Sequence, residues 1–308
     1  MDYPDYPFTP RAFVREGHKQ SYLDEGAGEP VLMLHGNPSW SYYYRHLVLG
    51  LRDRYRCIVP DHIGMGLSDK PDDEHYRYTL ERRVEDLEAL VQHLGEKRGL
   101  PQRGLTLVLH DWGGMIGMAW AARRPECVAR LVILNTAAFP NPRGRSIPIA
   151  LKLGRDSNLG SWLILEHNAF ARGAARFGVH RPMPPGVRAA YVAPYDSPQH
   201  RLATLRFVQD IPLGPEDPGY ELVARTAASL DRYADLPALI CWGMRDFVFD
   251  RRFLAEWRRH LPNAEVHEFP DAGHYVLEDA HERIVPLVRD FLARTAPAGA
   301  SEQSRVGA

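Results

Sequence analysis

The sequence of 308 residues has few of the features that mark secreted, membrane-spanning or metal-binding proteins. It holds three cysteines, Cys57, Cys127 and Cys241, whose odd number and wide spacing argue against a disulfide framework or a zinc site. We expect them to be reduced and buried. No run of about 18 apolar residues occurs, so no transmembrane segment is expected. Residues 1–8 lack the basic and apolar regions of a signal peptide, which favours a cytoplasmic protein.

An excess of charge is also absent. The chain has 38 Lys and Arg against 39 Asp and Glu, a formal net charge of −1. This balance gives no reason to expect nucleic acid or another polyanion as a partner. The sequence carries no metal or nucleotide signature, and we therefore expect no cofactor. Apolar residues make up 44% of the chain, which is enough for the core of one large domain.

Short apolar runs that predict buried strands alternate with helical patterns. This alternation is typical of an α/β fold with a mostly parallel sheet flanked by helices. The clearest predicted helix is Leu80–Leu94, with Thr79 as its N-cap and Gly95 at its end. A second amphipathic segment covers 284–292, where Pro286 would either kink the helix or lie in its first turn. The expected strands cover residues 31–35, 57–60, 105–110, 131–135, 238–242 and 265–269.

The composition changes after Asn135. Residues 137–225 are rich in proline, arginine and aromatic residues and lack clear strand signals. We interpret this segment as a helical cap inserted between two strands of an α/β core formed by 1–136 and 226–295. Residues 296–308 are small and polar, and we expect a disordered tail there.

The segment Val108–Gly114 reads Val-Leu-His-Asp-Trp-Gly-Gly and joins a strand to a helix. Asp111 stands where a serine hydrolase carries its serine, and an aspartate at this turn can act as a carboxylate nucleophile. The positive end of the following helix favours an anion at this position. Asp111 could instead only cap that helix. The strict form of this motif has a glycine where this chain has Leu109.

Three further motifs follow predicted strands. Asn37, in His-Gly-Asn-Pro, can donate two amide hydrogen bonds to an anion, and the indole of Trp112 can donate one. His274, in Asp-Ala-Gly-His-Tyr, is the expected base. Asp246, in Gly-Met-Arg-Asp, can orient its imidazole.

Asp250 is the nearest rival to Asp246 but lies further from the strand end, and Asp271 reads as a turn residue. The order nucleophile, acid, histidine is that of the α/β-hydrolase fold. The intact set argues against a purely ligand-binding or scaffold protein, which needs no nucleophile and base.

The motifs His-Gly-Asn-Pro and His-Asp-Trp-Gly-Gly together resemble the haloalkane dehalogenases. In that family the asparagine and tryptophan, here Asn37 and Trp112, hold the departing halide. Some members carry a glutamate after the strand that ends here at Asn135, whereas this chain keeps Asp246, as in the subgroup with an Asp–His–Asp triad. Epoxide hydrolases have a similar elbow, but they usually carry an aromatic residue at the position of Asn37. They also need two cap tyrosines, and spacing singles out none of the available ones, Tyr191, Tyr195 and Tyr220.

Four longer stretches, 60–71, 135–140, 191–196 and 207–213, resemble the β-lactone decarboxylases of bacterial long-chain olefin biosynthesis. The resemblance implies a hydrophobic cis-β-lactone substrate, which is converted to a cis-alkene and CO2 through Asp111. Attack at the alkyl carbon and attack at the carbonyl carbon both fit the sequence. The resemblance also implies partner enzymes of the same pathway, with the protein peripheral to the membrane through a pathway assembly.

The alternative is a haloalkane dehalogenase, which forms alcohol and halide through an alkyl ester on Asp111 that His274 hydrolyses with water. In either enzyme the cap would line the substrate cavity, although packing of the cap on the core is the better account of most of its apolar residues. The candidates for the lining are Trp162, Leu163, Ile164, Leu165, Phe170, Phe177, Tyr191 and Phe207.

Overall fold

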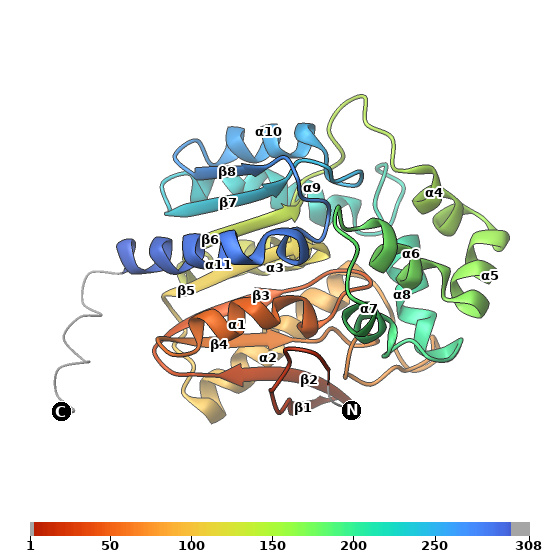
Figure 1. Cartoon of the computed structure of the whole chain (residues 1–308), viewed down its shortest axis with the longest axis horizontal. Coiled ribbons are helices and arrows are strands. Elements are labelled where there is room, and N and C mark those ends of the chain that lie inside the picture. The colour runs from red at the N-terminus through yellow and green to blue at the C-terminus, as the bar shows by residue number, and fades with distance from the viewer. Residues whose placement is uncertain (1–2, 297–308) are drawn as a thin grey trace.

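The computed structural model describes residues 3–296, which form an eight-stranded sheet with helices on both faces (Figure 1). The strand order is β1-β2-β4-β3-β5-β6-β7-β8. Strands β3 to β8 run parallel, and β1 and β2 pair antiparallel at one edge. This arrangement confirms the predicted α/β-hydrolase fold. The strands are β1 (Arg11–Arg15), β2 (His18–Glu25), β3 (Glu29–Leu34), β4 (Tyr55–Pro60), β5 (Leu105–Asp111), β6 (Val128–Thr136), β7 (Ala238–Gly243) and β8 (Glu265–Phe269).

All six predicted strands are present as β3 to β8, whereas β1 and β2 were not predicted. The sequence of β2, His-Lys-Gln-Ser-Tyr-Leu-Asp-Glu, contains no apolar run, and β1 is largely exposed. β1 lies at the edge of the sheet and β2 next to it, and neither has the continuous apolar run of the central strands that are buried on both faces.

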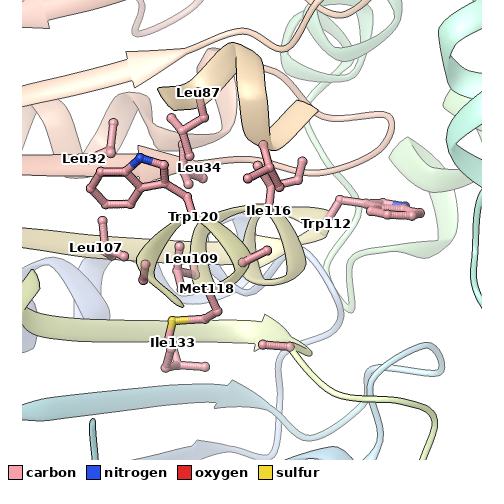
Figure 2. Close-up of a cluster of buried hydrophobic side chains, with 14 of the residues drawn as sticks. Leu32, Leu34, Leu87, Leu107, Leu109, Trp112, Ile116, Met118, Trp120 and Ile133 are labelled. Atoms are coloured by element: carbon pink, nitrogen blue, oxygen red, sulfur yellow. The ribbon is translucent and has the colours of Figure 1, made fainter. Parts of the chain in front are cut away.

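Alternate residues of the central strands enter two hydrophobic clusters. Leu32 and Leu34 of β3 pack on the side of α2 and α3, and Val31 and Met33 pack on the side of α1 and α11. Figure 2 shows the first cluster, in which Trp120 of α3 lies among leucines of β3 and β5. The core helices are α1 (Arg45–Leu51), α2 (Leu80–Arg98), α3 (Trp112–Arg123), α9 (Tyr220–Ser229), α10 (Arg251–His260) and α11 (Val276–Arg294).

Two helix predictions need correction. The hydroxyl of Thr79 does cap α2, but the helix continues through Gly95 to Arg98 and ends at Gly99, which has a φ of 62°. A glycine inside a helix costs only about 1 kcal/mol, so Gly95 does not end it. The kink in α11 lies at Ala280, with a φ of −144°, and Pro286 follows within the continued helix.

The inserted helices gather beyond the ends of β5 and β6, over the carboxyl edge of the sheet (Figure 1). Helix α9 begins inside the predicted cap segment 137–225 and ends beyond it, yet it packs against the core helix α3. We therefore propose that the cap consists of α4 to α8. The predicted tail covers 296–308, and residues 297–308 lie outside the residues that the structure describes. The cap helices are α4 (Ile149–Asp156), α5 (Asn158–His167), α6 (Ala169–Phe177), α7 (Pro185–Val192) and α8 (Leu202–Gln209), and the short 3-10 helices are η1 (Ser41–Tyr44), η2 (Pro125–Cys127), η3 (Gln199–Arg201) and η4 (Leu230–Tyr233).

Candidate active site

Asp111 stands in a sharp turn between β5 and α3. Its backbone has a φ of 51° and a ψ of −125°, a conformation that non-glycine residues adopt at an energetic cost. Two glycines allow the turn to form. A Cβ at Gly113 would overlap the backbone of Leu34, and one at Gly36 would overlap the carboxylate of Asp111. The predicted strand–turn–helix elbow is therefore present, and it holds the carboxylate at the end of the sheet.

The carboxylate of Asp111 is buried and held by fixed donors. Its Oδ1 accepts the backbone N–H of Asn37 at 2.7 Å, and the backbone N–H of Trp112 also bonds to it. Burial raises the pKa of Asp111, while the charge of His274 and the two backbone donors oppose this shift, and the net pKa lies above the ordinary value. The geometry presents an aspartate carboxylate that water solvates poorly, as suits a nucleophile.

His274 lies between the two predicted aspartates. Its Nε2 is 3.5 Å from Oδ2 of Asp111, and its Nδ1 is 2.9 Å from Oδ2 of Asp246. Burial lowers the pKa of His274, but the charge and hydrogen bond of Asp246 raise it, and the net shift is upward. The rival Asp250 instead caps α10 through the N–H of Arg252. The structure thus brings together the three residues proposed as a triad.

Two buried residues that sequence reasoning assigned no role hold this arrangement in place. The side-chain amide of Asn135 donates to Asp246 Oδ2 and to the carbonyl of Gly243, both at 3.0 Å. His110 Nε2 lies 2.9 Å from the carbonyl of His274 and therefore donates to it. Each is a polar residue at the end of a buried strand, and this position is the signal that could have identified them.

Asn37 and Trp112 line the cavity beside Asp111. One N–H of the Asn37 amide is already used, because Nδ2 donates to the carbonyl of Thr204 in α8 at 3.0 Å. The ring of Trp112 packs edge-on against Phe207, 5.4 Å between centroids. The guanidinium of Arg83 lies 5.1 Å from the centroid of the Trp112 ring. Figure 2 shows Trp112 extending from the start of α3, at the opposite end of the drawn cluster from Trp120.

The cavity above Asp111 has a volume of about 220 Å³ and is mostly apolar. Of the eight predicted lining residues, only Phe170 and Phe177 border it. Tyr191 instead donates to Glu278, and Phe207 packs on Trp112. The core and the loops next to the cap supply other lining residues, including Met115, Phe139, Ile147, Pro148, Phe247, Phe249 and Phe253.

A buried ionic cluster joins the cap to the helix that follows His274. Arg45 of α1 forms a two-pronged ion pair with Glu278 of α11, and Tyr191 of α7 donates to the same carboxylate at 2.6 Å. The ring of Tyr191 also stacks on Tyr275, 5.1 Å between centroids. The position of the cap and the position of the His274 loop therefore depend on shared contacts.

Comparison with known proteins agrees with this geometry. Residues 29–281 match the family model described as the alpha/beta hydrolase fold. The chain is 57% identical to a cis-3-alkyl-4-alkyloxetan-2-one decarboxylase of Xanthomonas campestris, over 96% of this chain and 99% of that protein. A decarboxylase of the same name from Shewanella oneidensis is 54% identical, over 94% of this chain and 90% of that protein.

The chain belongs to this decarboxylase family of α/β hydrolases. A haloalkane dehalogenase structure, DbeA from Bradyrhizobium elkani, has a TM-score of 0.83 and 27% identity, covering 94% of this chain and 98% of the other. This likeness confirms that the decarboxylase family is related to the dehalogenases. The decarboxylase names confirm the more specific resemblance inferred from the four stretches 60–71, 135–140, 191–196 and 207–213.

Residues 3–296 contain neither a metal-binding cluster nor a membrane-spanning helix. This part of the chain holds no group of three or more His, Cys, Asp or Glu side chains placed to bind a metal ion. None of its helices is long and apolar enough to cross a membrane. All three cysteines are unpaired and buried, and burial raises the pKa of Cys241 above its ordinary value, which disfavours its thiolate form.

Proposed function

We propose that the protein converts a cis-β-lactone carrying two long alkyl chains into a cis-alkene and CO2, with Asp111 as nucleophile. One observation carries the proposal: a buried aspartate faces an almost entirely apolar cavity, beside a His–Asp pair and next to Asn37 and Trp112. The relatives named for this reaction match this chain over nearly its whole length. An apolar cavity suits alkyl chains, and the two donors suit an anion that forms during the reaction.

The first step is attack of Asp111 on the ring carbon that bears an alkyl chain and the ring oxygen. A bond forms between the aspartate oxygen and this carbon, while the carbon–oxygen bond of the ring breaks and releases a carboxylate. The remaining N–H of Asn37 and the indole N–H of Trp112 would stabilise this carboxylate. Because these donors are fixed before the reaction, they need no reorganisation as charge develops.

The second step forms the alkene. Backside attack places the new aspartate–carbon bond anti to the carboxylate without rotation about the carbon–carbon bond. The bond to the carboxylate then breaks, its electrons form the double bond, and Asp111 leaves as carboxylate with release of CO2. The two alkyl chains keep their cis relation. Attack at the carbonyl carbon would leave intact the alkyl carbon–oxygen bond that must break, and we therefore favour attack at the alkyl carbon.

The proposed reaction consumes no water, and His274 then acts by its charge. The protonated imidazole, held by Asp246, would stabilise Asp111 as it leaves with its negative charge. In this role His274 need not remove a proton from water.

The test offers the purified protein a cis-β-lactone with two long alkyl chains and, in parallel, a 1-bromoalkane. Alkene is followed by gas chromatography and bromide by ion chromatography. We expect rapid alkene formation and slow bromide release, both abolished in Asp111→Asn. Asp271→Asn is the matched control, because Asp271 lies near His274 in sequence but pairs only with arginines at the surface. Alkene formation that persisted in Asp111→Asn would overturn the assignment.

Haloalkane dehalogenation is the second candidate because the chain keeps the His–Asp pair that hydrolysis of an alkyl ester requires. In His274→Ala, incubation with the bromoalkane should leave an alkyl ester on Asp111, which intact-protein mass spectrometry detects. If the wild-type protein released bromide and alcohol without forming any alkene from the lactone, dehalogenation would be its reaction.

A further inference from the structure

The cap differs from the rest of the chain in charge. Residues 137–192, which comprise the loop before α4 and the helices α4 to α7, contain eight Lys and Arg and two Asp and Glu, a net charge of +6, within a chain whose net charge is −1. The remaining residues therefore carry a net charge of −7. Five of the eight basic residues form no ion pair with any residue in 3–296, and all five are exposed: Arg143, Lys152, Arg172, Arg176 and Arg188. The positive charge of the cap is thus open to a negatively charged surface.

The same helices expose large apolar side chains. Ile149 is 87% exposed and Leu153 follows one turn later on α4, while Leu159 and Trp162 of α5 are more than half exposed. Helices α4 and α5 pack against each other at the outer edge of the molecule (Figure 1). Apolar residues that gather on one part of a surface mark an interaction site more often than scattered ones do.

Some of the exposed apolar residues lie next to, or among, the residues that line the cavity. On α4, Ala150 and Leu151 line the cavity, while Ile149 points to solvent. At the end of α6, Phe177 both lines the cavity and is 67% exposed. The apolar lining of the cavity is therefore continuous with apolar side chains that are exposed on the surface.

Three of the exposed arginines meet in one place. Arg172 and Arg176 of α6 and Arg188 of α7 line a shallow hollow between the two helices. No acidic side chain borders this hollow, so it suits phosphate groups.

We propose that the cap docks on an anionic lipid bilayer. The apolar side chains of α4 and α5 enter the boundary between headgroups and acyl chains, and the arginine hollow binds lipid phosphate. A basic surface with exposed Trp and Leu is typical of segments that lie in the membrane interface. A second copy of this face is a poor partner, because two surfaces of like charge would meet. The docking surface rests on the cap alone and does not depend on the reaction proposed above.

Trp162 provides a direct measurement. It is 51% exposed, whereas the other five tryptophans are at most 7% exposed. Vesicles of phosphatidylcholine and phosphatidylglycerol in equal parts should shift the fluorescence of the full-length protein to shorter wavelength, and brominated lipids should quench it. Vesicles of phosphatidylcholine alone should do so only weakly, and the response to anionic vesicles should fall as salt is added. The variant Trp162→Phe should lack the shift.

Charge reversal tests the arginine hollow. In sedimentation with anionic vesicles, Arg172→Glu/Arg176→Glu should reduce the bound fraction at a given lipid concentration and weaken binding about tenfold or more. The matched control, Arg103→Glu/Arg232→Glu, changes the net charge equally at exposed core positions without ion pairs in 3–296 and should bind as the wild type does. Circular dichroism would check that each variant is folded.

Three outcomes would overturn the proposal: no binding to anionic vesicles, equal binding to neutral ones, or equal loss in both double variants. Self-association that buried Trp162 without lipid, seen by analytical ultracentrifugation, would instead make a second copy the occupant. None of these outcomes affects alkene formation measured in detergent, so that assay tests the proposed reaction independently of the proposed lipid binding.

Discussion

The cavity is bounded on one side by the core, which we call its floor, and on the other by the cap, which we call its roof. The two sides are built differently. The core supplies the floor, where the groups proposed to react stand at or after the end of a strand: Asp111 at the end of β5, His274 after β8, Asp246 after β7 and Asn37 after β3. The cap supplies the roof, whose lining residues are apolar and come from helices and loops. Parallel strands bring their carboxyl ends to one edge, so reactive groups on the floor converge whatever the roof contains. We therefore expect the groups of the core to carry the chemistry and the apolar lining, to which the cap contributes Phe170 and Phe177, to select the substrate.

The largest expected effect is on the floor. In Asp246→Asn the amide would no longer accept the N–H of Nδ1, and His274 would be held in the wrong tautomer to act as a base. Bromide turnover should fall by about 10⁴-fold, as for the comparable change in a serine triad. Alkene formation should fall less, because it needs no base to activate water. Steady-state rates of both products measure the difference, and equal losses would show that His274 acts as a base in both reactions.

The next effect concerns the ionic cluster of Arg45, Glu278 and Tyr191, which joins the cap to the core. Glu278→Ala would leave the guanidinium of Arg45 buried without its partner, and the free energy of unfolding should fall by about 3–5 kcal/mol. Because Arg45 holds the pKa of Glu278 below its ordinary value against the effect of burial, this stabilisation is present at neutral pH. It is lost as the pH falls through the lowered pKa.

The matched control for this ionic cluster is Tyr191→Phe, which removes one hydrogen bond to Glu278 and leaves the ion pair with Arg45 in place. It should cost about 1 kcal/mol. Urea unfolding followed by circular dichroism measures both variants. Equal small losses would mean that the cap and the core are not held together by this cluster.

The two reactions should also differ in how their rates depend on pH, which is a smaller effect. On the acid side, each rate should fall about tenfold per pH unit. Alkene formation needs Asp111 ionised. Its raised pKa moves the loss of activity to a pH above that of an ordinary aspartate, about 3.9. Bromide turnover needs neutral His274, whose raised pKa moves the loss above about 6.5. Rate profiles for the two products should therefore fall at different pH, and coincident profiles would contradict separate roles for the two residues.

The same division explains what the sequence could predict. Asp111, His274 and Asp246 were located because each follows an apolar run that predicts a strand, and strand ends meet. The supporting bonds of Asn135 and His110 were not predicted, since they depend on which atoms face each other across two strands. The roof was predicted least well, because the direction of a cap side chain depends on how the helices pack, and periodicity does not fix that.

The smallest effect is expected from a single residue of the roof. Phe170→Ala enlarges the cavity without touching the floor, so it should change chain-length preference rather than the chemistry. An apolar wall contributes about 1–3 kcal/mol to discrimination, so the ratio of kcat/KM for longer and shorter lactones should rise about 10-fold or more. Leu163→Ala is the control, because Leu163 lies in α5 but does not line the cavity. If Phe170→Ala lowered kcat for all chain lengths alike, the roof would take part in the chemistry, and the division between floor and roof would fail.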